Sequence, residues 1–116
     1  MTMTGSCHCG KIAYELEGDV PTSAISCNCS MCQRKGSLLH FAPAGSFILK
    51  GSRDDLSTYR FNSESIQHHF CSTCGCSPFA EGEHPESGKM VAINLRCADG
   101  VDLDALQINQ VDGASA

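Results

Sequence analysis

The sequence contains no tryptophan and few other aromatic residues, only two Tyr and five Phe in 116 residues. A chain of this length forms one domain, and so few large aromatics limit the apolar area that its core can bury. The same chain holds 11 Gly and 9 Cys. We therefore expect residues 1–116 to be a single, loop-rich domain in which cross-links supply stability that the small core cannot.

Basic residues are also scarce: eight Lys and Arg against 13 Asp and Glu give a formal net charge of -5 at pH 7. Such a chain lacks the basic patches that non-specific binding to nucleic acids or anionic membranes needs. No stretch approaches the roughly 18 apolar residues of a membrane span. Residues 1–6, MTMTGS, have neither the basic nor the apolar part of a secretory signal. We accordingly predict no nucleic-acid partner, no membrane partner and a cytoplasmic location.

Cysteine is what the sequence has in excess, and seven of the nine cysteines fall in three short clusters. The clusters are Cys7-His8-Cys9, Cys27-Asn28-Cys29-Ser30-Met31-Cys32 and Cys71-Ser72-Thr73-Cys74. Thiolates this close in sequence can converge on one metal ion without long-range folding. An odd number of cysteines fits poorly with complete disulfide pairing, and a reducing cytosol favours metal thiolates. The pattern therefore favours zinc, with a disulfide framework as the alternative.

Seven clustered cysteines are enough for two zinc sites of different kinds. Four thiolates close a tetrahedral structural site, whereas three leave one position for water or a substrate. Joining Cys7 and Cys9 to Cys71 and Cys74 would make the closed site and tie residues 10–70 into a loop, although the sequence alone does not prove this pairing.

The middle cluster would then keep an open position. Three thiolates donate much electron density, so we expect such a zinc to activate a soft thiol better than water, which favours carbon–sulfur chemistry over hydrolysis. The alternative is that all seven cysteines are structural and a histidine completes the second site.

Alternation of apolar and polar residues predicts an all-β fold with the metal knuckles at strand ends. The expected strands are residues 11–16, 38–42, 46–50, 57–61, 65–70 and 89–96, with turns at 43–45 and 62–64. One short helix is expected, beginning at the capping-box pattern Ser30–Gln33 and ending at Gly36, with an ordinary turn as the alternative. Four phenylalanines are expected in the core: Phe41, Phe47, Phe61 and Phe79.

The three clusters, together with their flanking residues, carry a resemblance to a known family. The motifs are G-S-C-H-C-G at residues 5–10, C-x-C-x2-C at 27–32 and F-C-x2-C-G at 70–75. In this order, over residues 5 to about 113, they resemble the glutathione-dependent formaldehyde-activating enzyme family, also called the centromere-protein-V-like family. The resemblance implies a β-tent of small antiparallel sheets with zinc knuckles and two zinc ions per chain. It places a structural zinc on Cys7, Cys9, Cys71 and Cys74, and a catalytic zinc on Cys27, Cys29 and Cys32.

The activity that this resemblance implies is the condensation of glutathione with formaldehyde to S-hydroxymethylglutathione, which is carbon–sulfur lyase chemistry. We therefore predict a zinc-dependent enzyme whose partner is a small-molecule thiol or thiol adduct. Arg34 and Lys35 follow Cys32 directly, so they are candidates for binding the carboxylates of glutathione, unless they form only a solvated helix face. Two other classes stay open: a non-enzymatic, zinc-stabilised binding module, and a thiol-redox protein whose middle cluster releases zinc and oxidises.

Overall fold

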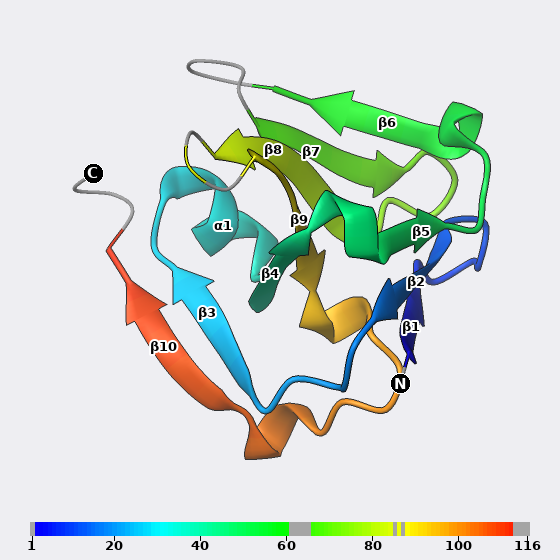
Figure 1. Ribbon diagram of the computed structural model, residues 1–116. Helices are drawn as coiled ribbons and strands as arrows, with labels where there is room; N and C mark the ends of the chain where they lie inside the picture. The colour runs from blue at the N-terminus through cyan, green and yellow to red at the C-terminus, as the bar shows by residue number, and fades with distance from the viewer. Residues whose placement is uncertain (1, 61–65, 85, 87, 113–116) are drawn as a thin grey trace.

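The computed structural model describes residues 2–60, 66–84, 86 and 88–112, which form two β-sheets and one short α-helix (Figure 1). The smaller sheet has three antiparallel strands in the order β1-β2-β5. They are β1 (Thr2–Ser6), β2 (Ala13–Glu17) and β5 (Phe47–Leu49). The helix, α1, spans Ser30–Lys35. The predicted all-β class with small sheets and at most one short helix is thus confirmed.

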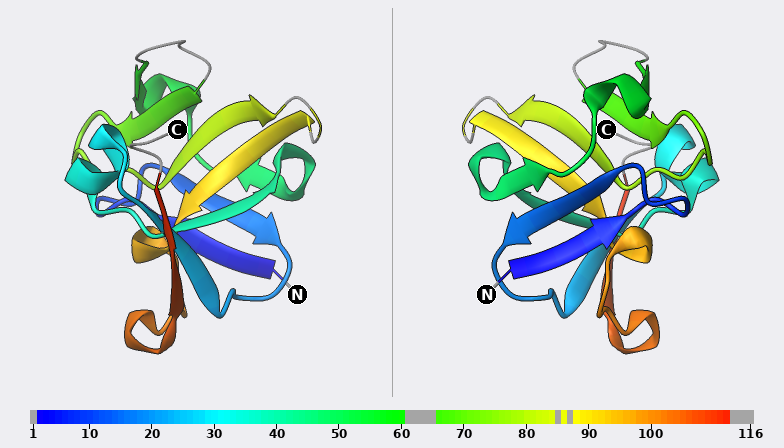
Figure 2. Two further views of the ribbon diagram at one scale, coloured as in Figure 1. Left: turned by 90° about the vertical axis from the view of Figure 1, so that its left-hand side faces the viewer. Right: turned by 90° about the vertical axis from the view of Figure 1, so that its right-hand side faces the viewer.

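The larger sheet has seven strands in the order β10-β3-β4-β9-β8-β7-β6. They are β3 (Ser23–Cys27), β4 (Leu39–Pro43), β6 (Leu56–Tyr59), β7 (Ile66–Cys71), β8 (Phe79–His84), β9 (Gly88–Asn94) and β10 (Gln107–Val111). All neighbours are antiparallel except β10, which pairs with β3 in parallel. Figure 2 shows this sheet running from β10, beside β3, to the β6–β7 pair on the opposite side of the molecule.

Short 3₁₀ turns link several strands. They lie at Ala44–Ser46, Arg53–Asp55, Leu95–Cys97 and Leu103–Ala105. The first of them replaces the simple turn predicted at 43–45. The hairpin turn predicted at 62–64 lies outside the described residues. In the described part of the chain, no helix is long and apolar enough to cross a bilayer.

The core lies between the two sheets and is built by the alternation that the sequence predicts. Ile12, Tyr14 and Leu16 are buried on one side, and Val91 and Ile93 of β9 are buried on the other. Aromatic rings bridge them: Phe47 of β5 stacks on Tyr14 at 5.4 Å between ring centroids and contacts Phe79 of β8 at 4.7 Å. Burial of these side chains in a dry interface supplies most of the driving force for bringing the sheets together.

The prediction for Phe41 was wrong, and Phe61 lies outside the described residues. Phe41 is 48% exposed on β4. It alternates with the buried Ala42, so its ring projects from the face of the larger sheet that is turned away from the core. Phe41 therefore lies on an exposed face of the larger sheet and not in the core.

Each of the six predicted strands overlaps an observed one, although the bounds differ and the last two residues of 89–96 belong to a 3₁₀ turn. Four strands were not predicted: β1, β3, β8 and β10. Each lacks a clear apolar alternation. The five residues of β10 are all exposed, and β8 places Glu81 and Glu83 on the same face as Phe79. Pairing with neighbouring strands holds these segments in extended form, which is a tertiary effect that a local pattern does not carry.

Candidate functional site

The first cysteine cluster joins the two sheets. Cys7 follows β1 and Cys71 is the last residue of β7, and the sulfur atoms of Cys7, Cys9, Cys71 and Cys74 all lie within 4.8 Å of one another. The Sγ–Sγ distance is 3.6 Å both for Cys7–Cys9 and for Cys9–Cys71. The structure thus brings together the two pairs that the sequence analysis grouped.

Local backbone geometry makes each half of this cluster. After β1, the N–H of Cys7 donates to the carbonyl of Ile12 at 2.8 Å, which turns the chain back on itself. After β7, the N–H of Gly75 donates to the carbonyl of Cys71 at 2.9 Å. Gly75 has φ +80°, a left-handed conformation that favours glycine. Gly75 of the F-C-x2-C-G motif therefore allows the turn after β7 that brings the sulfurs of Cys71 and Cys74 together.

Backbone N–H groups aimed at these sulfurs favour thiolates. Donors on Cys76 and then Cys9 lower the pKa of Cys74 to about 5, and the N–H of Cys74 is the main group that lowers the pKa of Cys71. The N–H of Lys11 acts in the same direction on Cys9, but burial and the adjacent sulfur of Cys71 outweigh it and raise the pKa of Cys9 to about 11. Four crowded thiols resist losing all their protons unless a cation compensates their charge.

The donor set and spacing of the first cluster fit zinc. A tetrahedral ion with metal–sulfur bonds of about 2.3 Å spaces its sulfur ligands roughly 3.8 Å apart, close to the 3.6 Å found here. Four sulfurs are the ligands of a closed structural zinc site. His8 is exposed and not part of the group, and Cys76 is half-buried outside it, where its carbonyl accepts from the N–H of Cys71 at 2.9 Å.

The second cluster lies where β3 meets α1. Cys27 ends β3, Cys29 is the N-cap of α1 and Cys32 is in its first turn, and their three sulfurs lie within 4.8 Å of one another. The cap differs from the predicted one at Ser30, because the Cys29 sulfur accepts from the N–H of Cys32 at 3.3 Å. The helix ends as predicted at Gly36, which has φ +69°.

All three cysteines of this cluster are half-buried, and the pKa values of Cys29 and Cys32 are shifted in opposite directions. Burial would raise the pKa of Cys29, but hydrogen bonds from the N–H and side chain of Cys32 and from Cys27 hold it below its usual value. Burial and the nearby Cys29 raise the pKa of Cys32 to about 12. Within the part of the chain that the structure describes, the cluster groups three ligands and no fourth His, Cys, Asp or Glu. Three thiolates that leave one position open fit a zinc ion able to take a further ligand.

A pocket of about 250 Å³ lies beside α1. It is lined by Met31, Lys35, Tyr59, His68, Phe70, Gly75 and Ser77. Lys35 of α1 lines this pocket, and its charge acts on the thiols of Cys32, Cys97 and Cys29 and on the imidazole of His68. Burial lowers the pKa of Lys35, against the effect of these cysteines. Burial, followed by the charge of Lys35, also lowers the pKa of His68, so its imidazole is neutral at neutral pH.

The two basic residues predicted to bind substrate have different surroundings. Lys35 lines the pocket, whereas Arg34 is exposed and its Nη1 donates to the carbonyl of Ser30 at 3.0 Å, one turn back in its own helix. Arg34 lines a shallower hollow together with Met31 and Tyr59. Lys35 is therefore the better placed of the two toward the second cluster.

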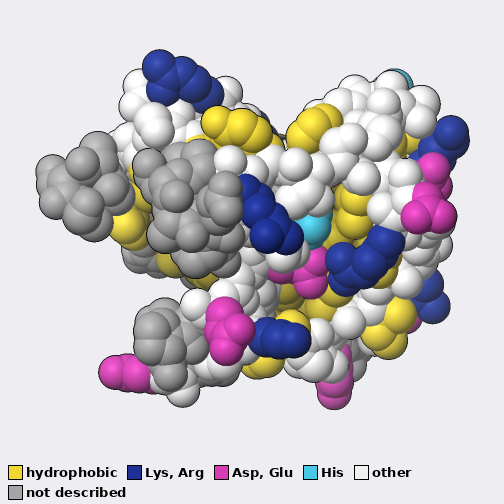
Figure 3. Space-filling view, turned by 90° about the horizontal axis from the view of Figure 1, so that it is seen from above, with side chains coloured by type: hydrophobic (Ala, Val, Ile, Leu, Met, Phe, Trp, Pro, Cys, Tyr) yellow, Lys and Arg dark blue, Asp and Glu magenta, His cyan; other side chains and the backbone are white. Residues whose placement is uncertain are grey.

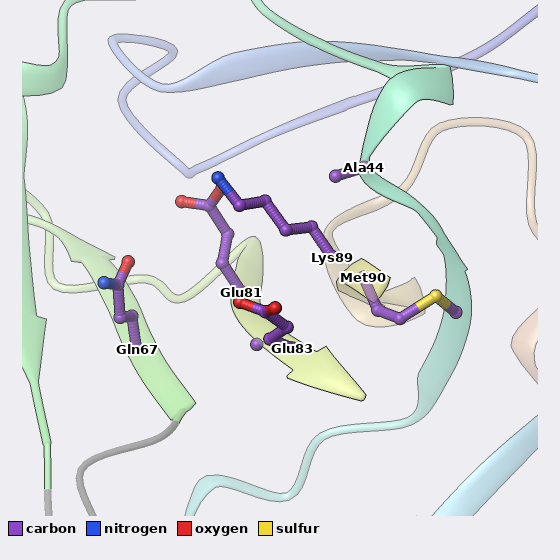
Figure 4. A pocket seen from close by; sticks show the side chains of 7 residues that line it. Ala44, Gln67, Glu81, Glu83, Lys89 and Met90 are labelled. Carbon is purple, nitrogen blue, oxygen red and sulfur yellow. The ribbon is translucent and has the colours of Figure 1, made fainter. Parts of the chain in front are cut away.

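A polar cluster that the sequence analysis did not predict lies on the face of β7 opposite to His68. His69 Nε2 lies 2.7 Å from Glu81 Oε1, Thr58 Oγ1 lies 2.9 Å from His69 Nδ1, and Arg53 Nη1 donates to Glu81 at 3.0 Å. Figure 3, the view from above, shows a histidine at the surface with Lys or Arg and Asp or Glu side chains next to it. In Figure 4 the side chains of Glu81 and Lys89 extend together into a pocket of about 210 Å³. These groups bond one another across β6, β7 and β8, so the polar cluster links the three strands.

Comparisons with known proteins bear on the family and the fold of this chain. The family model described as glutathione-dependent formaldehyde-activating enzyme matches residues 2–109. A crystal structure of a Rhodobacter sphaeroides protein, solved as a structural genomics target, is similar at a TM-score of 0.77 and 27% sequence identity. That match covers 92% of this chain and 100% of the other.

Proposed function

The chain belongs to the glutathione-dependent formaldehyde-activating enzyme family, and from this premise we propose that its second cysteine cluster is a reaction centre for a small thiol and formaldehyde. In the reaction a carbon–sulfur bond forms between the thiol sulfur and the aldehyde carbon, and the thiol proton ends on the aldehyde oxygen. The product is an S-hydroxymethyl thioether, and no oxidant or reductant is needed. The reverse reaction is carbon–sulfur lyase chemistry.

The observation that carries the proposal is the contrast between the two clusters. The first groups four sulfurs, including those of the buried Cys7 and Cys71, whereas the second groups the sulfurs of three half-buried cysteines at α1, and Met31 and Lys35 of the same helix line a pocket. A closed set of four ligands suits a structural role, and an open set of three suits a substrate.

Zinc is the metal that both donor sets fit, with one ion on each cluster. When bound at an open three-thiolate site, zinc lowers the pKa of a thiol at its fourth position and favours the nucleophilic thiolate. All nine cysteines are free thiols. We propose a reducing compartment, the cytoplasm, as the place where these sulfurs stay available.

The chain's own residues would position the reactants. The Lys35 ammonium, which lines the pocket, pairs with a carboxylate of the thiol and holds it near the cluster. The neutral imidazole of His68 offers a hydrogen-bond partner to the hydroxyl that forms on the former aldehyde carbon. Phe70, on the same wall, excludes water from the bond that forms.

Exchange between free thiol and adduct tests the proposal, because the reaction is reversible. We would measure it by NMR magnetisation transfer with ¹³C-formaldehyde and glutathione, and determine zinc per chain in the same samples. The expected result is faster exchange with the parent chain, loss of that acceleration in Cys29→Ser, and no change in Cys76→Ser, which removes a half-buried cysteine outside both clusters.

Two results would replace the proposal by another class. Two inert zinc ions with no acceleration would indicate a zinc-stabilised binding module. Release of one zinc by mild oxidant, reversed by a reductant and without acceleration, would indicate a thiol-redox protein.

A further inference from the structure

The strand that carries the first cysteine of the second cluster is held mainly by β10. All five residues of β3, from Ser23 to Cys27, pair with β10 in parallel register, and Val111 is the partner of Cys27. Among the described residues, β4 on the other side pairs with β3 only at Ile25 and Leu39. Figure 1 shows β3 and β10 side by side, below α1. The end of β3 at the cluster therefore depends on β10 for its position.

Two hydrogen bonds continue this pairing into the cluster itself. Asn28 stands between Cys27 and Cys29, which supply two of the three sulfurs. The backbone N–H of Asn28 donates to the carbonyl of Val111 at 3.1 Å, and its side-chain Nδ2 donates to Asp112 Oδ1 at 3.0 Å. The residue between two candidate metal ligands is thus bound to residues 111–112 through both its backbone and its side chain.

The side chains of β10 do not belong to the buried core. All five residues from Gln107 to Val111 are exposed, so the strand is held by its ladder with β3 and not by burial of its own apolar groups. The family match ends at residue 109, and Val111 and Asp112 lie beyond it. The contacts with Asn28 are therefore made by residues of this chain that the family match does not cover.

The position of Asn28 matters for metal binding because the three sulfurs come from two different elements. Cys29 and Cys32 lie at the start of α1, where the N–H of Cys32 donates to the Cys29 sulfur at 3.3 Å. Cys27 belongs to β3, and Asn28 alone connects this strand to the helix cap. Holding Asn28 in place therefore holds the Cys27 sulfur relative to the other two. Partners outside the ligand shell that orient ligands in this way raise metal affinity, because less freedom is lost on binding.

We propose that Asn28 and Asp112 are positioning residues for the metal of the second cluster. The Asp112 carboxylate holds the side-chain amide of Asn28, and the Val111 carbonyl holds its backbone. Together they keep the Cys27 sulfur beside those of Cys29 and Cys32, so that the site has its binding geometry before a metal ion arrives. The inference rests on the proposed function, because it concerns the metal of the same cluster.

Metal affinity of the second cluster, measured without any thiol substrate, tests this role. The chain is first loaded anaerobically with one equivalent of zinc, which the four-sulfur cluster takes first. Cobalt(II) is then titrated as the probe, because its bonds to thiolates absorb light. Cys29→Ser, which lacks one of the three ligands, gives the baseline. We expect Asp112→Ala and Asn28→Ala each to weaken cobalt binding about three- to tenfold, a modest loss because the bond between the two side chains is exposed.

Three further variants separate positioning from charge. Asp112→Asn removes the negative charge but keeps an oxygen that can accept from Asn28, so its cobalt affinity should stay within about twofold of the parent. Asp104→Ala is the matched control, since Asp104 is an exposed acidic residue of the 3₁₀ turn before β10, and its loss should also change affinity by less than about twofold. The double variant Asn28→Ala/Asp112→Ala should bind cobalt no more weakly than the weaker single variant, because both changes remove the same bond.

The outcomes distinguish this inference from the proposed function. If Asp112→Ala and Asn28→Ala bind cobalt like the parent, or if Asp112→Asn loses as much affinity as Asp112→Ala, the positioning role is wrong while the reaction centre stands. If Asp112→Ala weakens zinc binding at the first cluster equally, the residue supports the fold as a whole and the positioning role is again wrong. If the parent and Cys29→Ser bind cobalt equally, the second cluster holds no metal, and the proposed function fails with the inference.

Discussion

The sulfur atoms of Cys9 and Cys71 lie 3.6 Å apart, although 62 positions separate the two residues in the sequence. Cys9 belongs to the turn after β1 in the smaller sheet, and Cys71 ends β7 in the larger one. The first cluster therefore brings together cysteines from both sheets, and a metal ion bound there would cross-link them. The second cluster is local, since residues 27–32 supply all of it.

This difference predicts unequal effects of cysteine substitution on stability. Cys9→Ser should lower the free energy of unfolding by at least about 3 kcal/mol, because it weakens the metal site that joins the two sheets. Cys29→Ser should lower it by about 1 kcal/mol, since its cluster ties together only neighbouring residues. Urea unfolding with zinc analysis before and after chelation would check this. Equal losses from the two variants would contradict the division into a structural and an open site.

Gly51 is expected to tolerate no side chain. A Cβ at this position would lie 2.2 Å from the backbone carbonyl oxygen of Lys11, just before β2, which is too close for two atoms that are not bonded. We expect Gly51→Ala to cost about 2 kcal/mol of stability through this overlap. Gly45→Ala is the control, because its Cβ would enter open space and should change stability by less than about 0.5 kcal/mol. Thermal unfolding of the two variants would decide, and similar midpoints would contradict the predicted collision.

The hydroxyl of Tyr14 is predicted to contribute no hydrogen bond to the core. Its side chain is buried against Gly5, and among the described residues its oxygen has no hydrogen-bond partner. Burial raises the pKa of Tyr14, so the phenol stays protonated. Tyr14→Phe removes an unsatisfied polar group and keeps the ring that stacks on Phe47, so we expect a gain of about 1 kcal/mol. A loss of 1 kcal/mol or more in urea unfolding would show that the hydroxyl is bonded.

The Glu81 carboxylate is expected to stabilise the polar cluster that links β6, β7 and β8, and this stabilisation should depend on pH in a defined way. Burial acts to raise the pKa of Glu81, but hydrogen bonds from Arg53 and His69 outweigh it and hold the pKa below its usual value. A lowered pKa means that the stabilisation is complete above the unfolded-state pKa and is lost only as pH falls below it. Glu81→Gln should therefore cost about 1 kcal/mol at pH 7. The cost should be at least as large at pH 5.5, because burial lowers the pKa of His69 and the Glu81 carboxylate, which opposes this, is lost.

Urea unfolding of Glu81→Gln at the two pH values checks this expectation. Glu83→Gln is the control, since Glu83 is exposed two positions along the same strand and should cost less than about 0.5 kcal/mol. A difference between parent and Glu81→Gln that shrinks from pH 7 to pH 5.5 would mean that the pKa of Glu81 is raised.

Local spacing in the sequence was enough for several features. The two-residue alternation of Ile12, Tyr14 and Leu16 identified the buried face of β2, and the short separations within the cysteine clusters identified groups of sulfurs that converge. The extent of α1 up to Gly36 also followed from nearby residues. These properties depend on the geometry of a few consecutive residues, so a sequence pattern can reveal them.

Other features depended on which strands become neighbours. Pairing with neighbouring strands holds the unpredicted strands β1, β3, β8 and β10. Arg34 and Lys35 are adjacent in the sequence, but only Lys35 lines the pocket beside α1. A hollow of about 380 Å³ on the larger sheet joins Phe41, Ile66 and Met90 from three strands far apart in the chain. Sequence alone determined the residues that can bind metal and the class of fold. Only the tertiary structure decided which of them share a site and what lies beside it, because strand pairing is a long-range interaction that local patterns do not encode.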